Sequence, residues 1–176
     1  MTHEILLAGF GGQGILFSGK FLAYDGLLED REVSWLPSYG PEMRGGTCNC
    51  SVILSDTKIG SPIVSDPNVL VAMNLPSLDK FESAAVPGAK IFVDSSLIDR
   101  KVERDDVEVF YIPATKLASD ENLPGLANMI MIGHMIKHAG VMPYENVEKT
   151  MAKLVPAKKQ NLIELNIKAV ELGYNY

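Results

Sequence analysis

The sequence has few cysteines, no excess of basic residues and no long apolar run, and each of these absences excludes a class of protein. Its two cysteines, Cys48 and Cys50, share one predicted strand, where such neighbours seldom form a disulfide, so we expect reduced thiols. Sixteen Lys and Arg against 22 Asp and Glu give a net charge of −6, which argues against nucleic acid or an anionic membrane as the main partner. No apolar stretch approaches the roughly 18 residues of a membrane span, and Met1 to Glu4 lack the features of a signal peptide, so we expect a cytoplasmic protein.

The length and composition are those of one globular domain. The chain has 176 residues, of which 47% are hydrophobic and 22% are charged, and this is enough to bury a core without disulfides or metals. It contains no internal repeat, low-complexity tract or linker. We therefore expect a single domain over residues 1–176.

Short apolar segments alternate with segments of helical periodicity, which predicts a three-layer α/β domain with a mainly parallel sheet. The first unit, a strand followed by a glycine-rich turn and a helix, is Rossmann-like, and the C-terminal part is helical. The predicted strands cover residues 3–9, 32–36, 48–54, 58–64, 68–73, 90–94 and 107–112. The predicted helices cover residues 15–28, 77–85, 126–139, 144–155 and 158–172.

Two of the predicted helices carry apolar patterns that indicate how they are buried. The segment 126–136 is apolar nearly all round, so it is either an interior helix or a helix whose Met-rich surface packs on another subunit. In the last helix, the spacing of apolar residues predicts a buried stripe of Leu162, Leu165, Ala169 and Leu172, with Ile163, Ile167 and Val170 alongside it.

Residues 9–14 read Gly-Phe-Gly-Gly-Gln-Gly between a strand and a helix, which is the context of a dinucleotide-binding turn. Glycines let the backbone approach a ligand, and the free amides of a helix N-terminus suit an anion. NAD binding also needs an acidic residue at the end of the second strand, and no carboxylate stands at the tip of the strand over 32–36. A phosphate of another ligand, a structural turn and a subunit contact therefore remain as alternatives. The candidate cofactor-binding residues are Gly11, Gly12, Gln13 and Gly14.

A second candidate feature is the segment 38–47, which reads Ser-Tyr-Gly-Pro-Glu-Met-Arg-Gly-Gly-Thr. Its three glycines and one proline are unfavourable in helices and strands, so we expect an ordered loop whose specific shape serves a function. The arginine could fork onto a carboxylate or a phosphate, or it could pair with the neighbouring glutamate or with another subunit. The candidate active-site or subunit-facing residues are Ser38, Tyr39, Glu42, Arg44, Gly45 and Gly46.

These segments together resemble the gamma subunit of 2-oxoacid:ferredoxin oxidoreductases. The resemblance rests on the motif at 9–14, on Ser-Trp-Leu-Pro-Ser-Tyr-Gly-Pro-Glu-Met-Arg-Gly-Gly-Thr at 34–47, on Ile-Gly-Ser-Pro at 59–62 and on the tail over 162–174. It therefore spans essentially the whole chain. Within the family, the chain looks most similar to 2-oxoglutarate oxidoreductases, with pyruvate and branched-chain 2-oxoacid enzymes as near relatives.

The resemblance implies a multi-subunit enzyme that decarboxylates a 2-oxoacid on thiamine diphosphate and magnesium. Coenzyme A accepts the acyl group, and iron–sulfur clusters pass the electrons to ferredoxin. This chain has no Gly-Asp-Gly motif followed by an Asn pair for thiamine diphosphate, and its two cysteines are too few for a cluster. We therefore expect the cofactors on alpha, beta and delta partner subunits, and none of them, nor a metal or a catalytic residue, on this chain alone. The isolated chain is expected to be inactive and to form homo-oligomers.

By the same resemblance, the glycine turn and the loop face the partner subunits. We expect the helix N-terminus at residues 12–14 to take a phosphate of coenzyme A. Tyr39, Glu42 and Arg44 would line the entrance to the thiamine pocket or dock the catalytic subunit. The alternatives are a free-standing nucleotide-binding protein that uses the same turn and a scaffold that only holds the complex together.

Other chemistry-bearing side chains have simpler interpretations. His134 and His138 are four positions apart on one helix face but lack a third ligand, so a metal site is not expected. The two cysteines have no basic neighbour in sequence that would activate a thiol, which favours small buried residues. Asp94, at the end of a predicted strand, either binds a ligand or caps the following turn.

Overall fold

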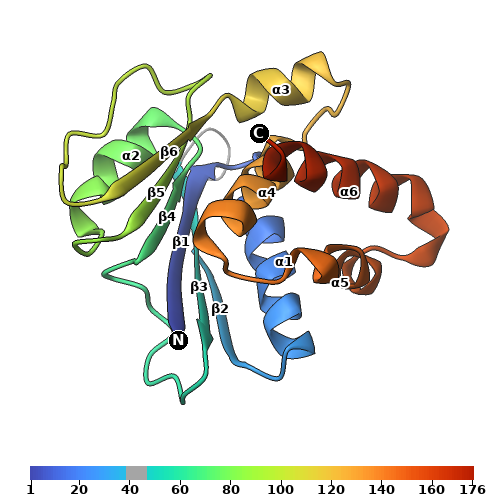
Figure 1. The fold of residues 1–176 in the computed structure, drawn as a ribbon, viewed down its shortest axis with the longest axis horizontal. Coiled ribbons are helices and arrows are strands. Elements are labelled where there is room, and N and C mark those ends of the chain that lie inside the picture. Colours follow the sequence, from blue (N-terminus) through green and yellow to red (C-terminus); the bar gives the residue numbers. More distant parts are fainter. Residues whose placement is uncertain (39–46) are drawn as a thin grey trace.

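The computed structural model describes residues 1–38 and 47–176, and a six-stranded sheet forms its centre (Figure 1). The strands are β1 (Thr2–Phe10), β2 (Glu32–Ser38), β3 (Thr47–Ser55), β4 (Val69–Ala72), β5 (Lys90–Asp94) and β6 (Glu108–Ile112). Their order across the sheet is β2-β3-β1-β4-β5-β6. Crossovers between parallel neighbours place helices on the faces of the sheet.

Strand β3 runs opposite to the other strands. It pairs antiparallel with β1 and with β2, whereas β4 pairs in parallel with β1 and β5, and β5 with β6. The parallel strands contain continuous buried runs such as Ile5 to Ala8 and Val69 to Ala72, because both faces of the sheet are covered there. The mainly parallel sheet that the sequence predicts is confirmed.

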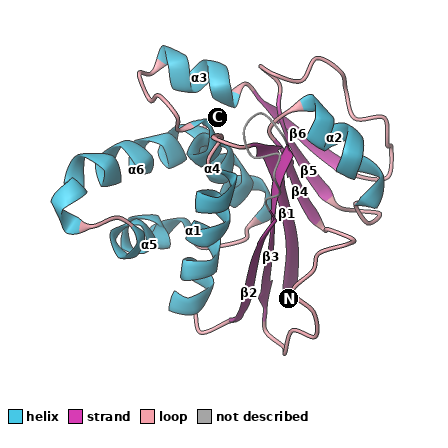
Figure 2. Cartoon of the chain, turned by 180° about the vertical axis from the view of Figure 1, so that it is seen from behind, coloured by secondary structure: helices cyan, strands magenta, loops and turns pink. Residues whose placement is uncertain are grey.

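Helices cover the two faces unequally, which confirms three layers. They are α1 (Ile15–Leu28), α2 (Leu75–Phe81), α3 (Ala114–Asp120), α4 (Ala127–Ala139), α5 (Val147–Leu154) and α6 (Gln160–Tyr174). Helices α1, α4, α5 and α6 gather on one face and α2 lies on the other (Figure 2), and each face has its own apolar core. Across the described ranges, we find no helix long and apolar enough to cross a bilayer.

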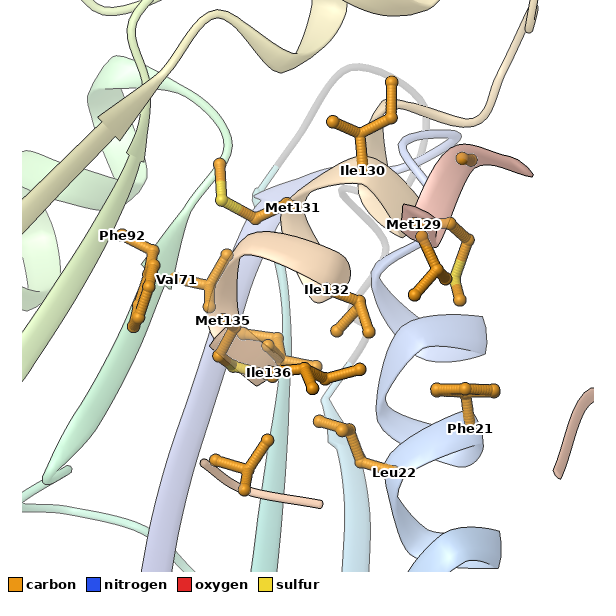
Figure 3. Close-up of a cluster of buried hydrophobic side chains, with 14 of the residues drawn as sticks. Phe21, Leu22, Val71, Phe92, Met129, Ile130, Met131, Ile132, Met135 and Ile136 are labelled. Carbon is orange, nitrogen blue, oxygen red and sulfur yellow. The ribbon is translucent and has the colours of Figure 1, made fainter. Parts of the chain in front are cut away.

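Helix α4 is the interior helix of the thicker layer. All its residues from Asn128 to Ile136 are buried within the chain. Figure 3 shows it between the strands that carry Val71 and Phe92 and the helix that carries Phe21 and Leu22. Because its three methionines are at most 1% exposed, the interior helix is confirmed. The alternative, a Met-rich surface for another subunit, is wrong.

Helices α4 and α6 approach so closely that neither has room for a side chain at their contact. A Cβ atom on Gly133 would overlap the carbonyl oxygen of Val170, and one on Gly173 would overlap the carbonyl oxygen of Ile130. Both obstacles are backbone atoms, so no side-chain rotation can relieve the overlap. Glycine on each helix therefore sets the distance between the two helices.

Replacing Gly173 by Ala should destabilise the protein. The added methyl group must push α6 away from α4, which should cost about 3 kcal/mol and lower the Tm by roughly 10 °C. Thermal unfolding followed by circular dichroism measures this. The matched control is Gly60→Ala, where a Cβ meets no atom within 4 Å and the backbone is not left-handed. Equal Tm values for the two variants would contradict the close contact.

Two predicted elements differ from the structure. Residues 58–64, predicted as a strand, form bends and irregular chain instead, since Gly60 and Pro62 interrupt the apolar run and Pro62 has no amide for a strand ladder. Helix α3 was not predicted, because its seven residues are too few to show helical periodicity. It begins directly after Pro113, and tertiary contacts at its first turn hold it.

The buried stripe predicted for the last helix is confirmed at Ala169, and at Ile163 and Val170 among the residues predicted alongside it, but its leucines are less buried than predicted. Leu162 is 41% exposed, and Leu165 and Leu172 are not fully buried. The buried side of α6 consists of Ile163, Asn166, Ala169, Val170 and Gly173. The reason is the close approach to α4, which admits small residues at the contact and turns the larger leucines to its sides.

A buried carboxyl group lies between α1 and α5. Oδ1 of Asp25 accepts hydrogen bonds from Asn146 Nδ2 at 2.9 Å and Thr150 Oγ1 at 3.4 Å, while Oδ2 is buried without a partner in the described chain. Burial, assisted by the neighbouring Glu29, raises the pKa of Asp25 from 3.8 to about 7. The folded state therefore favours the protonated acid. Its contribution to stability is present below about pH 4 and is lost as the pH rises to about 7.

The variant Asp25→Asn should remove this pH dependence. Asparagine keeps the acceptor for Asn146 and carries no charge, so the Tm of the variant should exceed that of the natural protein by roughly 5 °C above pH 7. The difference should shrink as the pH falls toward 4. The control for the change of charge is Asp30→Asn, at an exposed residue in the turn that follows the same helix. A pH-independent difference for Asp25→Asn would contradict the buried acid.

Candidate functional site

The turn between β1 and α1 leaves backbone amides free at the carboxyl end of the parallel strands. Gly12 and Gly14 have φ angles of 95° and 75°, in the left-handed region that favours glycine. The first hydrogen bond of helix α1 runs from the Ser18 amide to the Gly14 carbonyl, at 3.0 Å. The amides that precede Ser18 therefore have no partner within the helix. The amides of Gly12 and Gly14 have no hydrogen-bond partner elsewhere in the described residues either. The turn therefore presents donors at the positive end of a helix.

Gln13 ties this turn to two strands. Its Oε1 accepts from the Phe10 amide at 2.6 Å, and its Nε2 donates to the Met73 carbonyl, just after β4, at 3.1 Å. Its own amide donates to the Phe10 carbonyl at 3.1 Å. Gly9 makes room for it, because a Cβ there would lie 2.6 Å from Gln13 Oε1. Since its polar groups are engaged within the chain, Gln13 shapes the turn, and the glycine amides are left for a ligand.

A hollow of about 370 Å³ lies beside the turn at the ends of the parallel strands, where ligands bind in open α/β sheets. Gly12 faces open space, since a Cβ atom there would meet nothing within 4 Å. The residues that line the hollow include Gly12, Gln13, Met73, Leu97, Thr115 and Gly125.

The two sequence-predicted features lie at the same edge of the sheet. Ser38 ends β2 and pairs with Asn49, while Thr47 begins β3 and pairs with Phe10, directly before the glycine turn. Both ends of the predicted loop are therefore at the sheet edge that carries the turn, with Thr47 directly beside the turn and Ser38 one strand further out. The other candidate residues of this loop, Tyr39, Glu42, Arg44, Gly45 and Gly46, lie outside the described residues.

A second hollow, of about 240 Å³, lies between the N-terminal parts of α1, α4 and α6. Asn128 and Asn166 line it, and Asn128 Nδ2 donates to the Gly14 carbonyl and to Ser18 Oγ, each at 3.1 Å. Asn128 thereby holds the first turn of α1. Neither asparagine was predicted from the sequence, although each is a polar residue on an apolar helix face, which is the signal that could have found it.

Comparison with known proteins decides the family. A model of the pyruvate ferredoxin/flavodoxin oxidoreductase family matches residues 4–176. The chain belongs to this family. The 2-oxoglutarate synthase subunit KorC of Methanocaldococcus jannaschii is 36% identical over 177 residues, which cover 99% of this chain and 93% of the relative.

Two further relatives are a longer ketoisovalerate subunit and a gamma subunit of known structure. The ketoisovalerate oxidoreductase subunit VorA of Methanothermobacter thermautotrophicus is 37% identical over 170 residues, or 97% of this chain and 35% of the relative. The chain thus spans about a third of the length of the two ketoisovalerate subunits it matches. The gamma subunit of the keto/oxoacid ferredoxin oxidoreductase from Geobacter sulfurreducens has a TM-score of 0.83 at 28% identity, covering 98% of this chain and 96% of that one.

Next to the glycine turn, the strand order of this oxidoreductase-family chain differs from that of a dinucleotide-binding domain. In the latter, the second strand lies beside the first and ends in the acidic residue that binds the ribose. Here the antiparallel β3 separates β2 from β1, so Thr47 stands beside Phe10. Both the strand order and the lack of a carboxylate at the end of the predicted second strand therefore argue against NAD binding.

Asp94 caps the turn that follows β5 and the first turn of α3, and both of its carboxylate oxygens accept hydrogen bonds there. Its Oδ1 accepts from the amide and hydroxyl of Ser96, and its Oδ2 accepts from the amide and hydroxyl of Thr115 in the first turn of α3. Asp94 is fully buried. Of the two interpretations, the cap is confirmed, and it explains how the short helix α3 is held.

Cys48, Cys50 and His134 of this family member are buried, and His138 is half-buried. Cys48 and Cys50 are free and buried, as predicted, and burial raises the pKa of Cys50 to about 12. The rings of His134 and His138 are 4.5 Å apart, and burial lowers the pKa of His134 to about 4. Both imidazoles pack near Phe110. In the described part of the chain, no group of His, Cys, Asp or Glu is arranged to hold a metal.

Proposed function

We propose that this chain is a non-autonomous subunit of a 2-oxoacid:ferredoxin oxidoreductase. The complex would decarboxylate a 2-oxoacid, transfer the acyl group to coenzyme A and pass two electrons to ferredoxin. The observation that carries the proposal is the family match over residues 4–176, together with the KorC relative, 93% of which this chain covers. That relative favours 2-oxoglutarate as the substrate, and the VorA relative supports a branched-chain 2-oxoacid as the alternative.

The proposal assigns the cofactors of electron and group transfer to partner subunits. Cys48 and Cys50 are buried, and the raised pKa of both thiols makes them poor ligands for an iron–sulfur cluster. Trp35 and Leu36, on the edge strand β2, are 38% and 37% exposed and offer apolar surface that a partner, or a second copy of the isolated chain, would cover. The partners would be alpha, beta and delta subunits of the same enzyme.

A tagged copy of this chain, expressed in its native host, should co-purify with larger subunits. The captured complex should contain iron and show iron–sulfur absorbance, and it should reduce ferredoxin with 2-oxoglutarate and coenzyme A. The tagged chain refolded alone should show none of these activities. A chain that elutes without partners and whose Tm rises with NAD would instead support the free-standing nucleotide-binding protein.

Within the complex, the glycine turn is proposed to bind a phosphate of coenzyme A. The free amides of Gly12 and Gly14 and the positive end of α1 supply the attraction for an anion. The open space at Gly12 leaves room for a phosphate group. The loop that begins after Ser38 would face the catalytic partner from the same edge, through Tyr39, Glu42, Arg44, Gly45 and Gly46.

The variant Gly12→Asp should weaken binding of coenzyme A to the complex by about tenfold or more, because it places a negative charge at the phosphate. Isothermal titration of the purified complex measures the dissociation constant. Gly12→Asn is the matched control, since it has the same shape and backbone demand without the charge. If the two variants bind coenzyme A equally well, the turn does not hold a phosphate.

A further inference from the structure

A short helical segment lies across the side of α1 that faces away from the sheet (Figure 1). It consists of residues 143–156 and contains a single 3-10 turn, Tyr144–Asn146, followed by α5. Pro143 and Pro156 stand at its two ends, and a proline has no amide with which to continue a helix. The segment is therefore a separate unit between α4 and α6, and we call it the strap.

The strap has little apolar surface to hold it in place. The buried residues of α5 are Val147, Thr150 and Met151. By contrast, α4 is buried throughout from Asn128 to Ile136. Segments with few buried apolar side chains are the ones that open locally while the rest of a protein stays folded. The polar contacts of the strap are therefore important for keeping it closed.

One carboxyl group of α1 makes these polar contacts. Oδ1 of Asp25 accepts hydrogen bonds from Asn146 in the 3-10 turn and from Thr150 in α5, as described above. Oδ2 is buried and has no donor among the described residues. A carboxylate would leave this oxygen charged and unpaired, whereas a carboxylic acid is neutral and has an O–H of its own. The strap is therefore held best when Asp25 is protonated.

Neither α1 nor the strap forms an ion pair with Asp25 in the described chain. Glu29, one turn later in α1, is a second carboxyl group and raises the pKa of Asp25 further. The charged side chains of the strap are all exposed, and they are Glu145, Glu148, Lys149 and Lys153. An ionised Asp25 therefore gains no counter-ion from the two helices that meet there.

The strands behind α1 supply no counter-ion either. β2 and β3 contain one charged residue, Glu32, which is exposed. The other titratable groups of β3 are its two buried thiols, whose pKa is raised by burial, so they stay neutral. Arg31, in the turn before β2, donates to backbone carbonyl groups and pairs with Asp56. Ionisation of Asp25 therefore leaves a buried charge without a partner of opposite sign.

Proton binding at Asp25 is thereby coupled to closure of the strap. With the strap closed, the pKa of Asp25 is about 7. With the strap lifted, water reaches the carboxyl group and its pKa returns toward 3.8. The closed form binds the proton more tightly, so closure is most favourable below about pH 4. This advantage is lost as the pH rises to about 7.

We propose that residues 143–156 form a pH-sensitive strap, which protonated Asp25 holds against α1 and which opens locally when this carboxyl group ionises. The sheet and α4 remain folded in the open form. Opening uncovers the outer side of α1 and the apolar side of α5. The inference goes beyond the proposed function, because the strap needs no ligand and no partner subunit to respond to pH.

Hydrogen exchange of the full chain, followed by mass spectrometry at pH 6 and pH 8, tests the strap. After correction for the intrinsic effect of pH on amide exchange, the amides of α5 should be about tenfold less protected at pH 8. A low concentration of urea should leave the exchange of α5 unchanged, because local opening exposes little surface, and should accelerate that of α4. If α5 and α4 are equally protected and respond equally to urea, the opening is global and the strap is refuted.

The variant Asp25→Asn should make the protection of α5 the same at pH 6 and pH 8, because asparagine keeps the acceptor for Asn146 and cannot ionise. Glu29→Gln should move the pH dependence to lower pH, since the second carboxyl group no longer raises the pKa of Asp25, and the change between pH 6 and pH 8 should be smaller. Glu148→Gln is the matched control. It removes an exposed carboxylate of the strap itself and should keep the change of about tenfold. A change of that size that persists in Asp25→Asn would overturn the proposal.

Discussion

The contact of α4 with α6 is the constraint on which the candidate site depends. Glycines 133 and 173 let the two backbones touch, and this brings α4 against the sheet and α1 on its other sides. Asn128, near the start of α4, then reaches the Gly14 carbonyl and the Ser18 hydroxyl. The position of the α1 N-terminus is therefore set from a pair of helices that come more than a hundred residues later in the chain.

The glycine turn is held from two sides, and this explains why its amides remain free. Gln13 anchors it to the ends of β1 and β4 through the Phe10 and Met73 backbones. Asn128 anchors it to α4. The carbonyl groups at the two ends of the turn, those of Phe10 and Gly14, and the Gln13 side chain are engaged, while the amides of Gly12 and Gly14 are left to present to an anion. Rigidity supplied by such neighbours is what allows a loop to bind without a large loss of entropy.

Much of the fold could be predicted from local patterns. The β1-turn-α1 unit, the interior helix α4 and the parallel strands at β4 and β5 have strong apolar signals and short glycine boundaries. The misplaced strand over 58–64 and the missed helix α3 show the limit, because short segments carry too little periodicity. The leucines of the α6 stripe are less buried than predicted for a different reason. At the contact with α4, the buried positions are taken by residues such as Gly173 and Asn166 and not by the leucines. A pattern of hydrophobic residues does not show that two helix backbones approach closely.

The sequence by itself determined the family, the βα unit with its anion-ready turn, and the inert character of two cysteines without basic neighbours. These depend on residues that are close along the chain, where spacing fixes geometry. Only the tertiary structure decided that β3 separates β2 from β1, that Asp94 is a cap, and that Asn128 and Asn166 share a hollow. Each of these results from contacts between distant segments, and such contacts are set by packing in three dimensions, which no local spacing records.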